Sequence, residues 1–314
     1  MTPLALAVDI GGTKIAAALV DGEGRLAERR RAPTPASEGG AAIMAAVAAV
    51  SAPLLAAGGS RVVACGIGTA GVVDGHGRVA SATDLLRGWA GTDVKGVAER
   101  TLGLPAVVMN DCHAAGAGES RLGAARDAET ALVVAVGTGI GGALCRSGTP
   151  VTGRTGTAGS IGHVPAPPPP ALPDGPAPAP RRCSCGATDH VEAYASGPAV
   201  ERAYREAAGR ALPLAEIGRR AAAGDADGQR VIGDAATLLG RVLAGAANLL
   251  DPDVIVIAGG VSLLGPPLLA PLASAFRAEA LPGPRDIPVR AAALGGDAVL
   301  VGAGTHALAR AGGR

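Results

Sequence analysis

Lysine is almost absent from this sequence: it occurs only at Lys14 and Lys95, and arginine supplies the remaining positive charge. The formal net charge is +1 and no run of basic residues dominates, so the electrostatic pattern of a nucleic-acid-binding protein is missing. Nucleic acid is therefore not an expected partner. Because the chain is rich in Ala, Gly and Pro, the scarcity of lysine is most simply a compositional bias, and it adds only a little weight to Lys14.

Targeting and membrane-spanning segments are not evident either. The start, MTPLALAVDIGG, has no basic region and reaches Asp9 after a very short apolar run, which does not fit a signal peptide. No stretch approaches the roughly 18 uninterrupted apolar residues of a membrane-spanning helix. We therefore expect a cytoplasmic protein with no membrane partner.

Two common nucleotide-binding motifs are absent or poorly matched. No G-x-x-x-x-G-K-[ST] occurs, which excludes a P-loop enzyme. The run GTGIGG at 137–142 formally fits the dinucleotide fingerprint, but ALCRSGTPV after it resembles a strand and turn rather than a helix, and no acidic residue lies about 20 positions on. We favour a hairpin turn that binds phosphate through Gly137 and Gly139, with Thr138 as a hydroxyl donor, over an NAD-dependent enzyme.

Strand-like and helix-like segments alternate along the 314 residues, which predicts an α/β fold. The length suggests two domains with a site between them. Strands are expected at 4–10, 14–20, 62–68, 106–111, 131–145 (two strands around a glycine turn) and 253–260, and helices at 39–57, 112–125, 191–207, 226–250 and 297–310. Strands that end in glycine recur and suggest two similar halves. The Pro-rich segment 164–182 is expected to be an extended loop.

The turn VDIGGTK offers groups that could hold phosphate. Without Cβ atoms, Gly11 and Gly12 let backbone amides approach phosphate oxygens, and Thr13 and Lys14 add a hydroxyl and a positive charge. Asp9 at the strand end could orient Mg²⁺ or its waters. The alternative is an ordinary hairpin turn whose glycines supply positive φ.

Asp111 follows the apolar strand AVVMN, which places a carboxylate at the carboxyl end of a strand, where sites in α/β proteins usually lie. Such a carboxylate could accept the proton of a hydroxyl that attacks phosphorus, with Asn110 offering hydrogen bonds to a substrate. The alternative is that Asp111 caps the following helix, and both roles can coexist.

Four possible metal ligands occur at His163, Cys183, Cys185 and His190, the last three within the segment CSCGATDH. Cysteine and histidine are typical zinc ligands, and a site here would be structural and would fix the backbone near Glu192. The alternative is a reduced pair of thiols and two unrelated histidines, because Cys-x-Cys is tighter than the usual spacing.

Together DIGGTK (9–14), ND (110–111), GTGIGGA (137–143), GTAGSIGH (156–163) and CSCGATDHVEAYAS (183–196) closely resemble the ROK family of sugar kinases and repressors, over essentially the whole chain. The resemblance implies an actin-like (ribonuclease H-like) ATPase fold with two lobes around a central cleft, ATP and Mg²⁺ bound by glycine hairpins, and a structural Zn²⁺. It also implies Asp111 as the base that activates the 6-hydroxyl, a homodimer, an adenosine-side turn at Gly259 and Gly260, and sugar contacts from Asn110, His163 and Glu192.

Departures from the family pattern bear on the substrate. The family usually has Glu in A-G-E-x-G-H, where this chain has Ser160, so a charged acceptor for sugar hydroxyls is replaced by a short neutral one. The smaller residue could make room for an acetamido group, so N-acetylmannosamine is favoured among hexoses and N-acetylhexosamines, with glucokinase as the alternative. His190 stands where the family has a third zinc-binding cysteine, and Asp84 stands near an expected asparagine.

Two other functions are weighed against kinase activity. A repressor of this family has an additional N-terminal DNA-binding domain, for which no room is expected because the kinase-like sequence begins at residue 4. A non-catalytic sugar-binding protein would explain Ser160 but not the retention of Asp9, Lys14 and Asp111. We expect a smaller lobe at 1–118 and a larger lobe at 119–314 that contains the zinc-binding segment 163–190, with the C-terminal helix able to pack back on the smaller lobe.

Overall fold

The computed structural model describes residues 2–83, 85–166 and 179–312, so Asp84 and most of the Pro-rich segment lie outside the described residues. The chain forms two compact units: residues 1–133, 143–159 and 293–314 make the first, and residues 134–142 and 160–292 make the second. A lobe boundary at residue 118 stays a prediction.

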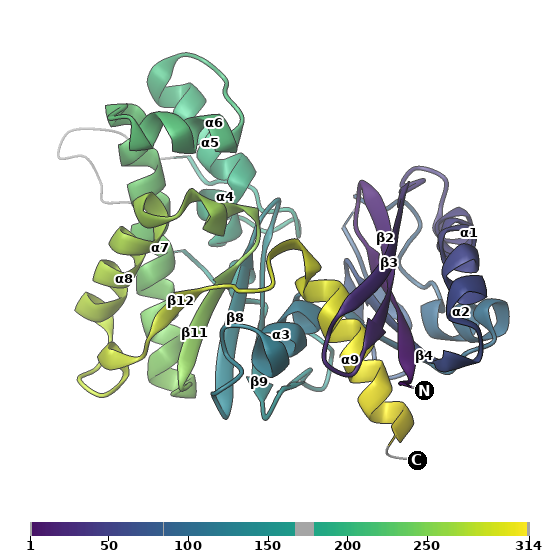
Figure 1. Ribbon diagram of the computed structural model, residues 1–314. Helices are drawn as coiled ribbons and strands as arrows, with labels where there is room; N and C mark the ends of the chain where they lie inside the picture. Colours follow the sequence, from purple (N-terminus) through teal and green to yellow (C-terminus); the bar gives the residue numbers. More distant parts are fainter. Residues whose placement is uncertain (1, 84, 167–178, 313–314) are drawn as a thin grey trace. The chain divides into compact units, whose positions relative to one another are not determined.

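Helices and strands alternate along the chain, as the sequence predicts (Figure 1). The strands are β1 (Leu4–Ile10), β2 (Lys14–Asp21), β3 (Leu26–Pro33), β4 (Val62–Thr69), β5 (Val72–Val73), β6 (Val79–Ser81), β7 (Ala106–Asn110), β8 (Thr130–Val136), β9 (Ile140–Arg146), β10 (Thr149–Pro150), β11 (Val254–Ala258) and β12 (Val289–Ala291). The α-helices are α1 (Gly40–Gly58), α2 (Val94–Leu102), α3 (Asp111–Leu122), α4 (Glu192–Ala195), α5 (Gly197–Ala208), α6 (Leu214–Ala222), α7 (Ala226–Leu250), α8 (Pro266–Glu279) and α9 (Ala298–Gly312).

The first unit is built on a five-stranded sheet with strand order β3-β2-β1-β4-β7. Strand β1 pairs antiparallel with β2 and parallel with β4, and β4 pairs parallel with β7. Helices α1 and α2 cover one face of this sheet, and α3 and α9 cover the other (Figure 1). The last helix therefore packs on the strands that begin the chain.

The two faces of β1 carry side chains of different size. Leu6, Val8 and Ile10 point into the core against α1, whereas Ala5 and Ala7 face α9. Alternation with period two follows from strand geometry. Small residues on the α9 side permit close packing: a Cβ at Gly66 would lie 2.0 Å from the Ala303 carbonyl oxygen.

The second sheet has strand order β10-β9-β8-β11-β12, which repeats the order of the first sheet when strands are counted along the chain. Strands β9 and β10 pair antiparallel, and β11 and β12 pair parallel. This repeated order agrees with the two similar halves inferred from the recurring strand–glycine pattern.

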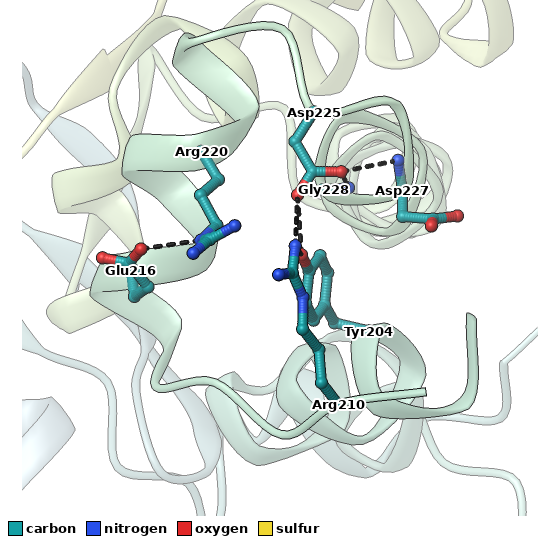
Figure 2. Close-up of polar contacts among 7 residues, drawn as sticks. All are labelled: Tyr204, Arg210, Glu216, Arg220, Asp225, Asp227 and Gly228. Atoms are coloured by element: carbon teal, nitrogen blue, oxygen red, sulfur yellow. Dashed lines mark hydrogen bonds and ion pairs between the residues drawn. The ribbon is translucent and has the colours of Figure 1, made fainter. Parts of the chain in front are cut away.

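In the second unit, the long helix α7 packs along α8 and also contacts α5 and α6. Polar contacts join α5 to the start of α7, and a separate pair, Glu216–Arg220, lies within α6 (Figure 2). The buried Tyr204 hydroxyl donates to Asp225 Oδ2 at 2.6 Å and accepts from Arg210 at 3.1 Å, while Asp225 Oδ1 accepts from the amides of Asp227 and Gly228 at the first turn of α7. Asp225 is thus both the N-cap of α7 and the partner of α5.

Helix α1 is long and strongly apolar, although no membrane-spanning segment is predicted from the sequence. An 18-residue window within Gly40–Arg61 has a mean hydropathy of 2.0, enough by length and composition alone to cross a membrane. Core helices of soluble proteins meet the same criterion, and the Ile43, Val47 and Leu54 side chains of α1 are fully buried in the core of the first unit.

Candidate active site

The first glycine turn lies between β1 and β2 and presents exposed Thr13 and Lys14 side chains. The Gly11 amide donates to the Lys14 carbonyl at 3.1 Å, and the Thr34 hydroxyl donates to the Gly11 carbonyl at 2.7 Å. Neither Gly11 nor Gly12 has a positive φ, so positive φ does not explain these glycines. A Cβ on Gly12 would lie 2.6 Å from the exposed Leu85 side chain, which would have to move.

Asn110 ends β7 and caps helix α3. Its Oδ1 accepts from the amides of Cys112 at 2.9 Å and His113 at 3.3 Å, and its Nδ2 donates to the Gly71 carbonyl at 3.0 Å. The N-cap alternative considered for Asp111 is therefore filled by Asn110, one residue earlier. Asp111 is the first residue of α3, and its Oδ1 also accepts from the Cys112 amide at 2.8 Å.

Two carboxyl groups of the first unit have raised pKa values. Burial, then the charge of Asp111, raise the pKa of Asp9 to about 6, and Lys14 opposes the shift. Burial also raises the pKa of Asp111, opposed by hydrogen bonds from Cys112 and Asn110. Perturbed carboxyl groups of this kind are common at functional sites because burial makes proton exchange possible near neutral pH.

The predicted nucleotide residues of the second unit form two adjacent turns. In the turn after β8, the Gly137 amide donates to the Gly139 carbonyl at 2.8 Å, and Thr138 is exposed. Gly259, at the end of β11, has φ of 85°, and a Cβ there would lie 2.4 Å from the Val136 carbonyl oxygen. Only glycine fits at this position, so the turn at 259–260 lies directly beside the end of β8.

Glu192 connects the glycine turn after β8 with the segment 183–190, which we call the cysteine segment. This buried carboxylate accepts from the Ile140 amide at 2.8 Å through Oε2, and from the Ser184 hydroxyl and the Cys183 thiol through Oε1. A Cβ on Gly139 would lie 2.6 Å from Glu192 Oε2. These contacts were not predicted from the sequence, because Ser184 and the Ile140 amide carry no motif of their own.

The four predicted metal ligands lie together in the second unit. Their ligand atoms all fall within 4.8 Å of one another, with Cys183 Sγ 3.4 Å from His163 Nδ1 and Cys185 Sγ 3.2 Å from His190 Nδ1. Ligands of a tetrahedral zinc ion are roughly 3.3–3.8 Å apart, given Zn–S and Zn–N bonds of about 2.3 and 2.0 Å. The donor set therefore fits zinc.

Ser160 precedes the short 3₁₀ helix Ile161–His163, and its carbonyl accepts from the His163 amide at 3.0 Å. His113, which the sequence analysis did not select, is buried on α3, and its Nε2 lies 2.8 Å from the Ala158 carbonyl oxygen. Predicted site residues thus gather in two sets: Asp9, the turn 11–14, Asn110 and Asp111 in the first unit, and the glycine turns, Ser160, Glu192 and the metal ligands in the second.

Comparison with known proteins decides the family. The family model described as "ROK family" matches residues 5–310. The chain belongs to the ROK family. The predicted resemblance is thereby confirmed.

Named relatives of this ROK protein are sugar kinases. It is 33% identical to a glucokinase of Halalkalibacterium halodurans, over 95% of this chain and 92% of the relative. It is 34% identical to an N-acetylmannosamine kinase of Escherichia fergusonii, over 82% of this chain and 83% of the relative. The predicted enzyme class, a sugar kinase, agrees with both.

A solved structure also matches over nearly the whole ROK chain. It is a ROK family glucokinase from Streptomyces griseus in complex with glucose and AMPPNP, with a TM-score of 0.82, 34% sequence identity, and coverage of 98% of this chain and 99% of that one. This likeness confirms the predicted actin-like α/β fold.

Proposed function

We propose that this ROK protein transfers the γ-phosphate of ATP to the 6-hydroxyl of a hexose or N-acetylhexosamine, with N-acetylmannosamine favoured. The observation that carries the proposal is the position of Asp111, a half-buried carboxylate at the junction of β7 and α3 whose pKa is raised and whose charge acts on Asp9. A group with a raised pKa accepts a proton more effectively at neutral pH.

Asp111 acts as the general base. It accepts the proton of the sugar hydroxyl as the hydroxyl oxygen forms a bond to the γ-phosphorus and the bond from that phosphorus to the β,γ-bridging oxygen breaks. The products are a sugar phosphate and ADP. Its Oδ1 is fixed by the Cys112 amide at 2.8 Å, which orients the carboxylate before substrate binds.

The predicted glycine turns bind the nucleotide. Backbone amides of Gly11, Gly12, Gly137 and Gly139 contact phosphate oxygens, Thr13, Thr138 and Lys14 add side-chain donors, and Gly259 and Gly260 lie on the adenosine side. Asp9 holds Mg²⁺ or its waters, since Mg²⁺ is usually bound by one or two carboxylates together with substrate phosphates.

Sugar is bound by Asn110, Ser160, His163 and Glu192. Asn110 and Glu192 already use their polar atoms within the protein, so their contribution includes positioning of α3 and of the turn after β8. Ser160 is the residue that we connect with substrate choice, because a serine leaves more space than glutamate for an acetamido group. Glucose is the alternative substrate, supported by the named glucokinase relatives.

His163, Cys183, Cys185 and His190 bind a structural zinc ion, which when bound would fix the cysteine segment. The contact of Cys183 with Glu192 relates this cluster to the turn after β8. By the family resemblance we further propose a cytoplasmic homodimer. The alternative to kinase activity is that the protein binds sugar without catalysing phosphate transfer.

The test is ADP release with Mg²⁺-ATP on glucose, mannose, N-acetylglucosamine and N-acetylmannosamine, compared by kcat/KM. We expect the highest value for N-acetylmannosamine, and a Ser160→Glu variant that shifts preference toward glucose. Ser60→Glu, at an exposed serine between α1 and β4, is the matched control. A preference for glucose in the unaltered protein would assign glucokinase activity instead. Sugar binding with no ADP release from any sugar would favour the non-catalytic account.

A further inference from the structure

A polar cavity lies in the first unit at the C-terminal end of α3, away from the residues discussed so far. Its volume is about 390 Å³. It is lined from α3, from the turn between β9 and β10, from α9 and from Gly22 after β2. Asp111 begins α3 and Arg121 lies in its last turn, so the rise of an α-helix separates them by about 15 Å.

The charged residues that line the cavity are both arginines, Arg121 and Arg126, and none is acidic. Arg121 Nε donates to the Gly148 carbonyl at 3.1 Å, and no carboxylate among the described residues pairs with its guanidinium. Arg126 is exposed and lies 3.7 Å from an oxygen of the exposed Asp127, a separation at which surface pairs contribute little.

Two further carboxylates near this end of α3, Glu119 and Glu129, have other partners. Glu119 is fully buried and accepts from the amides of Ala124, Ala293 and Leu294. Glu129 lies 3.3 Å from Arg146. The positive charge at the cavity is therefore not neutralised by these groups.

Ser120 lines the cavity, but its hydroxyl does not open into it. The residue is 5% exposed, and its buried Oγ has the Cys145 thiol beside it and no other partner among the described residues. The two arginines are therefore the charged groups that a ligand in the cavity would meet.

His306 also indicates that positive charge predominates in this part of the first unit. This α9 residue is buried, its Nδ1 also has no partner among the described residues, and burial, then the charges of Arg121 and Arg310, lower its pKa to about 4. Its ring is thus neutral at physiological pH in a region where positive charge predominates.

We propose that this cavity binds the phosphate group of a small molecule, through the guanidinium groups of Arg121 and Arg126. Arginine donors match phosphate oxygens, whereas a metal cation would be repelled. The volume is at the lower end of the range for small-molecule sites, enough for a phosphate with a short organic group. An alternative is that Arg121 only holds Gly148 next to the helix end; that role uses Nε and leaves the two terminal nitrogens for a ligand.

The experiment is calorimetric titration of inorganic phosphate into the full chain saturated with Mg²⁺ and a non-hydrolysable ATP analogue, which occupies the proposed nucleotide site. We expect saturable binding that weakens roughly tenfold or more in Arg121→Gln. Arg100→Gln is the control, because Arg100 is an exposed arginine of α2 whose partner Asp93 is 4.0 Å away, and it should bind like the unaltered protein.

Should Arg121→Gln fold poorly, as judged by its melting temperature, Arg126→Gln carries the test, with weakened phosphate binding expected. Glycerol phosphate should compete with inorganic phosphate, and glycerol should not. No saturable binding, equal binding in all cavity variants, or failure of glycerol phosphate to compete would overturn the proposal.

Discussion

Asp9 and Asp111 lie near the carboxyl ends of β1 and β7, close enough that the charge of Asp111 raises the pKa of Asp9. Parallel pairing explains this placement: Asp9 is in register with Gly68 of β4, and Gly68 is in register with Met109 of β7, two residues before Asp111. The sheet register thus brings together two carboxyl groups more than 100 positions apart in the sequence.

The raised pKa of Asp9 predicts a stability cost at neutral pH. A carboxyl whose pKa is about 6 when folded and 3.8 when unfolded binds protons more tightly in the folded state, so the cost is present above pH 6 and disappears as the pH falls below about 4. Asp9→Asn should therefore raise the free energy of unfolding by on the order of 1–3 kcal/mol at pH 7.5. Urea unfolding at pH 7.5 and pH 4 measures the difference, with exposed Asp127→Asn as the control; equal stabilisation at both pH values would contradict the assignment.

The same substitution should damage function. Loss of the Asp9 carboxylate removes the proposed Mg²⁺ contact, so the KM for Mg²⁺-ATP should rise in Asp9→Asn at pH 7.5. In the unaltered protein KM should rise as pH falls below about 6, while in the variant it should change less over that range. Steady-state kinetics between pH 5 and 8 test this, and identical pH profiles would remove Asp9 from the nucleotide site.

Asp111→Asn separates catalysis from binding. The amide preserves shape but cannot accept the proton, so kcat should fall by about 10²–10⁴-fold while the dissociation constant for sugar changes little. Rapid-quench turnover and calorimetric sugar binding provide the two values, and Asp127→Asn is again the matched control. Near-normal turnover would remove Asp111 from the mechanism.

Removal of zinc should loosen the cysteine segment of the second unit. Cys185→Ser removes one ligand from the exposed side of the cluster, so bound zinc measured by atomic emission should fall from about one ion per chain toward zero. Melting temperature should fall with it, and a chelator should lower that of the unaltered protein but not of the variant. Cys112→Ser, outside the cluster, is the control; no bound zinc in the unaltered protein would contradict the proposed site.

Tyr204→Phe tests the polar cluster of Figure 2. Its hydroxyl is buried and joins α5 to Asp225 at the start of α7, so its removal should lower the free energy of unfolding by about 1 kcal/mol. Tyr194→Phe is the comparison, because the Tyr194 hydroxyl also donates to an aspartate but is only half-buried. Urea unfolding should show the larger loss for Tyr204→Phe, and an equal or smaller loss would show that the cluster adds little.

Much of the fold could be predicted because its central strands have clear patterns. Apolar runs bounded by glycine or aspartate identify β1, β4, β7 and β11, and the recurring strand–glycine pattern anticipates the repeated sheet order. Helix α8 was not predicted because its sequence PPLLAPLA contains prolines; two of them occupy the first helical turn, where no amide donor is needed. The stretch expected as one helix at 191–207 is two, because Ser196-Gly197-Pro198 interrupts it.

Site residues with distinctive chemistry, such as Asp111 and the four metal ligands, could be selected from the sequence. Contacts through the backbone could not, since the Ile140 amide that binds Glu192 and the Ala158 carbonyl beside His113 carry no sequence signal. The capping function was assigned to Asp111 as an alternative, one residue too late, because both Asn and Asp are good N-caps and only the helix boundary distinguishes them.

The most direct test of the central claim is to incubate the unaltered protein with Mg²⁺-ATP and each of the four sugars, and to measure sugar phosphate by mass spectrometry alongside ADP. We predict equal amounts of ADP and sugar 6-phosphate for at least one sugar, dependent on the sugar and abolished in Asp111→Asn. ADP formation that does not depend on sugar, or no phosphorylated product from any of them, would contradict the assignment as a sugar kinase.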